Sequence, residues 1–463
     1  MGRTFKTVSP DNLVTITEYR SLQNRVASGI PHAQPQFCVD LSAATLLGGG
    51  EVEVTVDPGG LARKSYSCVN MRKQVLLSVD GQKGSVRFEY DAGGRLEKMF
   101  GPTGATTIHS YDEFGNRVRS SDPDFGLWQY AYDSFGQLIR QIDAKNQIAT
   151  VEYDVLERIV RRQENDSTTI WHFDQAAHGI GKTSAVEKSN GYRENYSYDG
   201  LGRSQSVAVQ IGKEQFVTSM DYDRLGRPST LYYPTAFSVR NRYDKKGFLV
   251  GLEDTRDNED FWTVNDIDKY GRITGERYGN GAVTTRAFNE RNGRIEEIEA
   301  VTENDRRILK LNLKYDLIGN LERRTESVEG KIETFKYDAL DRLIEMDSAG
   351  ERSRYAFDAA GRLTYKQGVG TYHYAQTPGE IEADKAKPFH AVLQTSNSEG
   401  HHRFVYDLNG NMIGGPQGHF EYTSDNRTAL VYTDQDDWTR FDYGPAGNRF
   451  REFVRRGTNF ESP

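Results

Sequence analysis

The chain has 463 residues and a formal net charge of −8, with 67 acidic and 59 basic side chains interspersed along it. This balance excludes the basic stripe that a nucleic-acid-binding protein needs to displace counterions from phosphates. Hydrophobic residues make up only 36%, whereas Tyr (26), Phe (22) and Gly (45) are abundant. Burial must rely on aromatic rings and the chain must turn often, so we expect many short strands rather than long helices.

The first 54 residues carry strand and turn signals in a weak form. Ser9-Pro10-Asp11-Asn12 has a turn composition and Tyr19 follows it by about ten residues, so we predict a degenerate N-terminal repeat region at 1–54. This segment lacks the apolar stretch of a secretion signal. We therefore expect a secreted or cell-surface protein that leaves by a non-classical route or within a larger complex. Cys38 and Cys68 are too few for a disulfide framework, and we expect two reduced thiols.

From about residue 55 the sequence repeats itself. A Tyr-Asp pair or a near equivalent is followed by a short loop with Gly, then often by Arg or Asn and an apolar residue. The first four copies follow one another at steps of 21 residues. The copies are Tyr90-Asp91, Tyr111-Asp112, Tyr132-Asp133, Tyr153-Asp154, Phe173-Asp174, Tyr198-Asp199, Tyr222-Asp223, Tyr243-Asp244, Ile267-Asp268, Phe288-Asn289, Tyr315-Asp316, Tyr337-Asp338, Phe357-Asp358 and Tyr406-Asp407, with Tyr422 and Tyr443 as degraded copies.

Each repeat is predicted to form two strands and two turns. A second turn composition, such as Gly101-Pro102-Thr103-Gly104, stands about ten residues before many of the pairs. Between turns, apolar and polar residues alternate, as in 309–315, which indicates strands with one buried face. A single hairpin is unstable in water, so neighbouring hairpins must pair. We predict an all-β fold in which hairpins pair side by side into a long, curved and spiralling antiparallel sheet.

The spacing of these motifs resembles that of the Rhs/YD-repeat family, which includes bacterial Rhs toxins, insecticidal toxin-complex shell proteins, teneurins and wall-associated proteins. The resemblance covers residues 55–463, with an irregular insertion at about 366–403. Within it, Lys387-Pro388-Phe389-His390-Ala391-Val392 and the later Tyr406–Met412 resemble a passage late in many bacterial Rhs shells. The resemblance implies a partial cocoon-like shell that encloses a toxic polypeptide and keeps it unfolded or inactive until delivery.

Two features of that family are absent from the sequence. Its Tyr-rich core segment with an aspartyl self-cleavage motif does not occur after residue 450, and no toxin domain is expected. We therefore predict a non-enzymatic structural shell segment that encapsulates or presents a toxin or effector polypeptide. Its expected partners are that cargo or an adjoining Rhs shell chain, and possible ligands include carbohydrate, with no nucleic acid and no membrane span.

Two groups of residues suggest chemistry. Asp57-Pro58-Gly59-Gly60-Leu61 matches the self-cleavage pattern, but it precedes the repeats and occupies a recurrent turn position. His373, His390, His401 and His402 cluster within 30 residues without a tight metal-binding motif. We interpret the first group as a turn, and we expect no metal site at the histidines, of which His390 is interpreted as a packed, hydrogen-bonded side chain. No catalytic, cofactor-binding or metal-binding residue is assigned, and no cofactor is expected.

Two other functions remain open at this stage. One is a cell-surface adhesion or carbohydrate-binding module, in which repeated Tyr would act with Trp128, Trp171, Trp262 and Trp438. Strand aromatics more often pack across strands, which favours the shell. The other is a polysaccharide-cleaving lyase or hydrolase. Because the Asp residues recur at the turns of the repeat, we interpret them as structural residues and not as catalytic ones.

Overall fold

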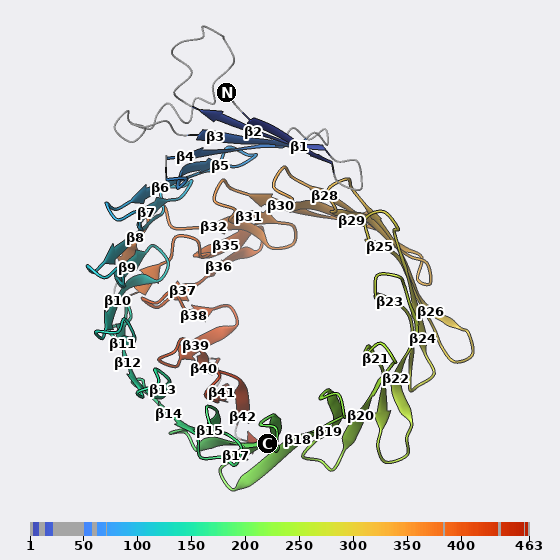
Figure 1. Ribbon diagram of the computed structural model, residues 1–463. Coiled ribbons are helices and arrows are strands. Elements are labelled where there is room, and N and C mark those ends of the chain that lie inside the picture. Colours follow the sequence, from blue (N-terminus) through green and yellow to red (C-terminus); the bar gives the residue numbers. More distant parts are fainter. Residues whose placement is uncertain are drawn as a thin grey trace. The chain divides into compact units, whose positions relative to one another are not determined.

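The structure is a computed structural model, shown in Figure 1. It describes residues 3–8, 14–21, 51–57, 63–70, 72–382, 385–433, 437–457 and 459–461. Within these residues every regular element is a β-strand. None of the described residues belongs to a helix that is long and apolar enough to cross a membrane.

The strands are short and follow one another at tight turns. The first part of the chain contains β1 (Arg3–Val8), β2 (Val14–Ser21), β3 (Glu51–Asp57), β4 (Arg63–Val69), β5 (Val75–Val79), β6 (Ser85–Tyr90), β7 (Leu96–Phe100), β8 (Thr106–Tyr111), β9 (Arg117–Asp122), β10 (Gly126–Tyr132), β11 (Leu138–Ile142), β12 (Ile148–Tyr153), β13 (Ile159–Gln163), β14 (Thr168–Phe173), β15 (Thr183–Lys188) and β16 (Tyr192–Tyr198). The middle contains β17 (Ser204–Ile211), β18 (Glu214–Tyr222), β19 (Pro228–Tyr232), β20 (Ser238–Tyr243), β21 (Leu249–Asp254), β22 (Asp260–Ile267), β23 (Ile273–Tyr278), β24 (Val283–Phe288), β25 (Ile295–Val301), β26 (Arg307–Tyr315), β27 (Leu321–Glu326), β28 (Lys331–Tyr337), β29 (Leu343–Ser348) and β30 (Glu351–Phe357). The last part contains β31 (Leu363–Lys366), β32 (Gly370–His373), β33 (Glu380–Glu382), β34 (Lys385–Lys387), β35 (Gln394–Asn397), β36 (Gly400–Arg403), β37 (Val405–Tyr406), β38 (Met412–Gly415), β39 (Gly418–Tyr422), β40 (Thr428–Tyr432), β41 (Trp438–Tyr443), β42 (Arg449–Arg456) and β43 (Asn459–Glu461).

The fold is a long antiparallel sheet that is not closed, and the predicted all-β class is confirmed. Most strands pair with the next strand in the chain, as in β16–β17 and β17–β18, whereas β32 pairs with β35 and β34 with β37. The strands from β33 onward, apart from β35 and β36, belong to a second, nine-stranded sheet. The chain divides into two compact units: residues 1–128, 288–296 and 311–410 form unit 1, and residues 129–287, 297–310 and 411–463 form unit 2.

Two kinds of turn alternate along the sheet. We call the turns that begin with the Tyr-Asp pair corners, and the turns at the other ends of the hairpins opposite turns. Because adjacent strands run in opposite directions, corners share one edge of the sheet and opposite turns share the other. The register shifts at the Asp199 corner, where Ser197 pairs with Ser206 but Tyr198 pairs with Ser204, and the same shift occurs at the Asp91 and Asp338 corners. Such a bulge bends the strand and increases its local twist.

Burial is modest in most strands and concentrates at a few points. In unit 1, Phe389 is almost fully buried and packs with Ala105 and Ala375, with Leu393 against them. Phe389 lies within the segment that resembles the late Rhs passage, so this part of the predicted insertion contributes a small core.

Cys68 of β4 is buried and disulfide-bonded, so the expectation of two reduced thiols is wrong. A count of cysteines gives no information on which residues folding brings together, and that proximity decides whether a bridge forms. Cys38 lies outside the described residues, as do residues 58–62 of the DPGGL-like segment and most of 1–54. The interpretation of that segment as a turn stays a prediction.

Candidate functional site

The recurrent corner is the site that the sequence repeats most often, and the Asp199 corner illustrates its geometry. Asp199 Oδ1 accepts backbone hydrogen bonds from Leu201 at 2.9 Å and Arg203 at 2.8 Å. The Gly202 amide donates to the Asp199 carbonyl at 2.8 Å. Gly202 has a φ of +74°, a left-handed conformation that glycine adopts without steric cost. The carboxylate and the glycine together hold the turn in place.

The arginine of the corner joins its own hairpin to the next one. Arg203 Nε donates to Asp199 Oδ2 at 2.6 Å, and the Arg203 guanidinium Cζ lies 4.1 Å from the ring centroid of Tyr222 in the following corner. The same arrangement recurs in unit 1, where Arg95 lies over the Tyr111 ring and donates from Nη1 to the Asp112 carbonyl at 2.9 Å. A planar guanidinium suits this double task because it can donate and stack at once.

The tyrosine of the corner bonds in the other direction along the chain. Tyr198 Oη donates to the Thr183 carbonyl at 2.7 Å, 15 residues earlier. The tyrosine therefore bonds to the preceding hairpin, whereas the arginine contacts the following hairpin. Equivalent bonds to an earlier backbone carbonyl are made by Tyr90, Tyr111, Tyr153, Tyr222, Tyr243, Tyr337, Tyr374, Tyr406, Tyr422 and Tyr443.

These contacts determine the protonation of the corner. The hydrogen bond from the Arg203 side chain holds the pKa of the Asp199 carboxyl below its ordinary value. Burial raises the pKa of the Tyr198 phenol. Both shifts favour the forms present at neutral pH, a charged acceptor and a neutral donor. The Asp199 carboxylate and the Tyr198 hydroxyl are thus in the forms that suit their hydrogen bonds within the chain.

Not every corner has all the parts. Glu157 and Asp341 stand where other corners have Gly, with φ of 64° and 62°. Gln137 and Phe248 replace the arginine at the corners of Asp133 and Asp244. At these positions the sequence departs from the motif while the backbone turn is kept, as shown by the Gln137 amide that donates to Asp133 Oδ1 at 2.9 Å.

Within unit 1, turns that are far apart in sequence also touch. His390 donates from its backbone amide to Asp124 Oδ1 at 2.8 Å, and its ring Nδ1 lies 2.6 Å from Asp124 Oδ2. Arg342 Nη2 donates to Gln82 Oε1 at 2.6 Å. These partners are 266 and 260 residues apart in the chain. Asp124 lies in the opposite turn between β9 and β10, and Gln82 lies in the opposite turn between β5 and β6.

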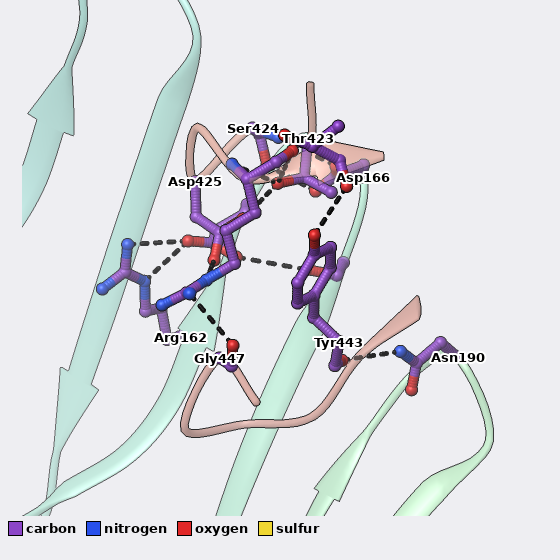
Figure 2. A network of polar contacts seen from close by, with 12 residues as sticks. Arg162, Asp166, Asn190, Thr423, Ser424, Asp425, Tyr443 and Gly447 are labelled. Atoms are coloured by element: carbon purple, nitrogen blue, oxygen red, sulfur yellow. Dashed lines mark hydrogen bonds and ion pairs between the residues drawn. The ribbon is translucent and has the colours of Figure 1, made fainter. Parts of the chain in front are cut away.

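Unit 2 contains contacts between residues that are similarly far apart in the sequence. Ser424 donates from its backbone amide to Asp166 Oδ2 at 2.9 Å and also bonds Asp166 through its hydroxyl. Asn190 Nδ2 donates to the Tyr443 carbonyl at 3.0 Å. Figure 2 shows both contacts, which join residues 258 and 253 positions apart. Nearby, the rings of Tyr192 and Phe450 lie 4.7 Å apart.

The four clustered histidines do not share a site. His373 Nε2 lies 2.7 Å from the Ser396 hydroxyl, His390 binds Asp124, and His401 and His402 are exposed on β36. In the part of the chain that the structure describes, no group of three or more His, Cys, Asp or Glu side chains could hold a metal ion.

A cavity of about 710 Å³ opens beside β32, β34 and β36 in unit 1. It is lined by His373, Lys385, Lys387 and Arg403 together with apolar side chains.

The tryptophans considered for carbohydrate binding lie on separate strands. Trp128 Nε1 donates to the Phe125 carbonyl at 2.9 Å, and Trp262 Nε1 donates to Glu276 Oε2 at 2.8 Å. Trp171 and Trp438 lie on β14 and β41. The bonds of Trp128 and Trp262 both stay within a hairpin, as expected for side chains that pack within the sheet.

Comparisons with known proteins agree with this geometry. The model of the family described as RHS Repeat matches residues 337–371, which include the Asp338 and Asp358 corners. The resemblance to the Rhs/YD-repeat family is confirmed. This chain is 25% identical over 292 residues to the double-stranded DNA deaminase toxin A of Burkholderia cenocepacia (strain H111), with 61% of this chain and 17% of the toxin covered.

Solved structures share the fold of this chain. The Photorhabdus luminescens Tc holotoxin pore matches with a TM-score of 0.75 at 14% identity, over 98% of this chain and 25% of that chain. A TcdB2-TccC3 crystal structure matches with a TM-score of 0.72 at 13% identity, over 98% and 27%. The chain thus spans about a quarter of these structures and less than a fifth of the curated relative, and at such identities the likeness concerns the fold.

Proposed function

We propose that this chain is a non-enzymatic wall segment of an Rhs-type shell that encloses or presents a toxin or effector polypeptide. The interlocked corner carries the proposal. The arginine belongs to one hairpin while its ring partner belongs to the next, as in Arg203 with Tyr222, Arg227 with Tyr243 and Arg342 with Phe357. A sheet tied together in this way can be thin and still hold its shape, which is the property that a container needs.

The relatives support the same role. The curated relative is named a toxin, and the similar structures come from Tc toxin assemblies. One of them is a TcdB2-TccC3 complex without a hypervariable C-terminal region, so in that case the shell fold exists without that region. For this chain we infer export as part of a secreted complex, with the cargo or an adjoining Rhs chain as partner.

The use of the corner residues also supports a structural role over an enzymatic one. In the described corners the Asp carboxylates accept turn amides and arginine N–H groups, and the Tyr hydroxyls donate to carbonyls. Groups engaged in this way are poorly available as a general acid or base. The hydrogen-bond acceptors of Trp128 and Trp262 likewise lie within their hairpins.

Protection of a cargo from protease tests the proposal. The chain would be produced together with the polypeptide encoded directly after it, purified, and digested with a broad-specificity protease. We expect the cargo to co-purify and to be cleaved at least about tenfold more slowly than the cargo alone, because a protease cuts segments that it can reach in the open state.

A wall variant and a matched control sharpen the experiment. Arg158→Ala combined with Arg203→Ala removes two interlocking arginines, whereas Arg456→Ala removes an exposed arginine at the end of β42. We expect only the double variant to lose protection. Equal cleavage of the cargo with and without the wild-type chain would contradict a container role.

A further inference from the structure

A row of large apolar side chains projects from the corners. We call the second residue after the corner Asp the tip. In unit 2 the tips Phe135, Leu156, Leu201 and Leu225 are between 66% and 81% exposed. Consecutive corners are two strands apart, or about 10 Å. The four tips therefore stand at multiples of this spacing along one edge, with a gap at the Asp174 corner, where the tip is Ala176. Isolated exposed apolar residues are ordinary, but a row of them along one edge indicates an interaction surface.

Tips in the later part of the chain are less exposed, and unit 1 shows what covers them. Leu340, the tip of the Asp338 corner, is half-buried, and its Cδ2 would lie 3.9 Å from a Cβ built on Gly81. A Cβ on Gly84 would lie 2.9 Å from the Ala359 carbonyl oxygen of the next corner. Both glycines belong to the opposite turn between β5 and β6, so a corner edge here rests on an opposite-turn edge.

The same rule holds in unit 2. Ser424 belongs to the corner after β39 and binds Asp166 in the opposite turn between β13 and β14. Tyr443 begins the corner after β41 and accepts from Asn190 in the opposite turn between β15 and β16. Every contact of this kind described above joins a corner edge, or the His390 segment, to an opposite-turn edge.

We propose that the tip row at Phe135, Leu156, Leu201 and Leu225 binds the opposite-turn edge of a further stretch of Rhs-repeat wall. The occupant follows from continuity with the contacts that cover the later corners. It follows also from spacing, because opposite turns recur every two strands, as the tips do. The opposite turns of a wall built from the same repeat therefore have the spacing of the tips, whereas an isolated loop or a globular surface would not have it. The inference rests on the fold and does not depend on a cargo.

A chain with one additional turn of wall tests this. Residues 1–336 would be followed by residues 90–463, so that Tyr90 takes the place of Tyr337 and the second-copy Asp91 corner meets the Gly81 turn. The register then places second-copy Leu201 on the first-copy opposite turn at Asn190. Single cysteines would be introduced as Leu201→Cys or Lys213→Cys, in one copy at a time, and their alkylation by a maleimide followed. Lys213 is exposed in the opposite turn between β17 and β18.

The expected result is reciprocal. Second-copy Leu201→Cys should react about tenfold more slowly than first-copy Leu201→Cys, because its edge is covered and reacts only on local opening. Lys213→Cys should show the reverse, slow in the first copy and fast in the second, which makes each position the control for the other. Equal rates in the two copies at both positions would overturn the proposal.

The natural chain gives a second measurement that does not require the longer chain to fold. In dilute solution of the unextended protein, Leu201→Cys should react at a rate similar to Lys213→Cys. Slow alkylation of Leu201→Cys in dilute solution would mean that the edge is already covered within the chain, and this outcome overturns the proposal. A rate at both Leu201→Cys and Lys213→Cys that falls with rising concentration, and recovers when Phe135, Leu156 and Leu225 are changed to Ser, would show that the opposite-turn edge of a second copy covers the row, which supports the proposal.

Discussion

Arg158 donates from Nη2 to Asp174 Oδ2 at 2.8 Å, an ion pair that connects two consecutive corners. The same guanidinium pairs with Asp154 in its own corner and lies over the Phe173 ring, 4.2 Å from its centroid. Side-chain hydrogen bonds from Asp174 and Asp154 raise the Arg158 pKa above its ordinary value. A single residue therefore connects the β12–β13 and β14–β15 hairpins.

Replacing Arg158 should loosen both hairpins without unfolding the chain. For Arg158→Ala we expect backbone amides of β12 to β15 to exchange about tenfold faster, as local opening becomes easier. Hydrogen–deuterium exchange measures this. Arg161→Ala is the control, because its ion pair with Glu152 at 3.7 Å is exposed on both sides and such pairs contribute little. Unchanged exchange in Arg158→Ala would contradict the interlock.

The backward tyrosine bond should make a measurable contribution. Tyr198→Phe removes the hydroxyl that donates to the Thr183 carbonyl and keeps the ring. We expect a loss of about 1 kcal/mol in the free energy of opening the β14–β15 and β16–β17 hairpins, the usual net value of one hydrogen bond. Hydrogen exchange under native conditions reports it. Tyr270→Phe, on an exposed tip, should have no effect.

Two corner positions offer opposite glycine substitutions. Glu157 has a φ of 64° where other corners have Gly, so Glu157→Gly should stabilise its hairpin by about 1 kcal/mol because a left-handed conformation strains residues with a Cβ. Gly202→Ala, at φ +74°, should destabilise its hairpin by a similar amount. Thermal unfolding compares the two variants. A change of the same sign in both would contradict this account of the corner.

Acid should weaken the corners. The Arg203 hydrogen bond lowers the pKa of Asp199 from 3.8, so the folded chain prefers the ionised form. The stabilisation is present above the unfolded-state value and is lost as pH falls through the lower folded value. Backbone hydrogen bonds from Arg158 and Arg227 are the first causes of the same direction of shift at Asp154 and Asp223.

We therefore expect the unfolding temperature to fall steeply below about pH 4. Circular dichroism melts between pH 2 and pH 6 measure it. Asp199→Asn should make the dependence shallower, since the substituted side chain does not titrate. An unfolding temperature that stays constant down to pH 2 would rule out the carboxylates as the acid-sensitive groups.

The contact between Asp166 and Ser424 should hold the late hairpins of unit 2 in place. Asp166→Ala removes both acceptors of the Ser424 backbone and hydroxyl groups. We expect amides of β39 and β40 to exchange about fivefold faster, which corresponds to about 1 kcal/mol. Asp166→Asn retains one acceptor oxygen and should give an intermediate rate. Identical exchange in Asp166→Ala and the wild-type chain would mean that this contact is not stabilising.

The sequence predicts those parts of the fold whose cause is local. The corner of Asp199 depends on residues up to Arg203, and the strands follow from alternation over six or seven positions. The contact of Asp124 with His390 spans 266 residues, and no local pattern marks either partner. The backward bond of Tyr198 was also missed, although its recurrence at each repeat was a possible signal. The disulfide bond of Cys68 was missed because it depends on which residues folding brings together, and no local pattern shows that.

The alternation of corners and opposite turns has a consequence for how such genes can change length. Insertion or loss of a whole hairpin leaves every later Tyr-Asp pair on its original edge, with its arginine still one corner from its partner. Insertion or loss of a single strand would move all later pairs to the other edge and invert the faces of every strand that follows. Viable length variants should therefore differ by an even number of strands.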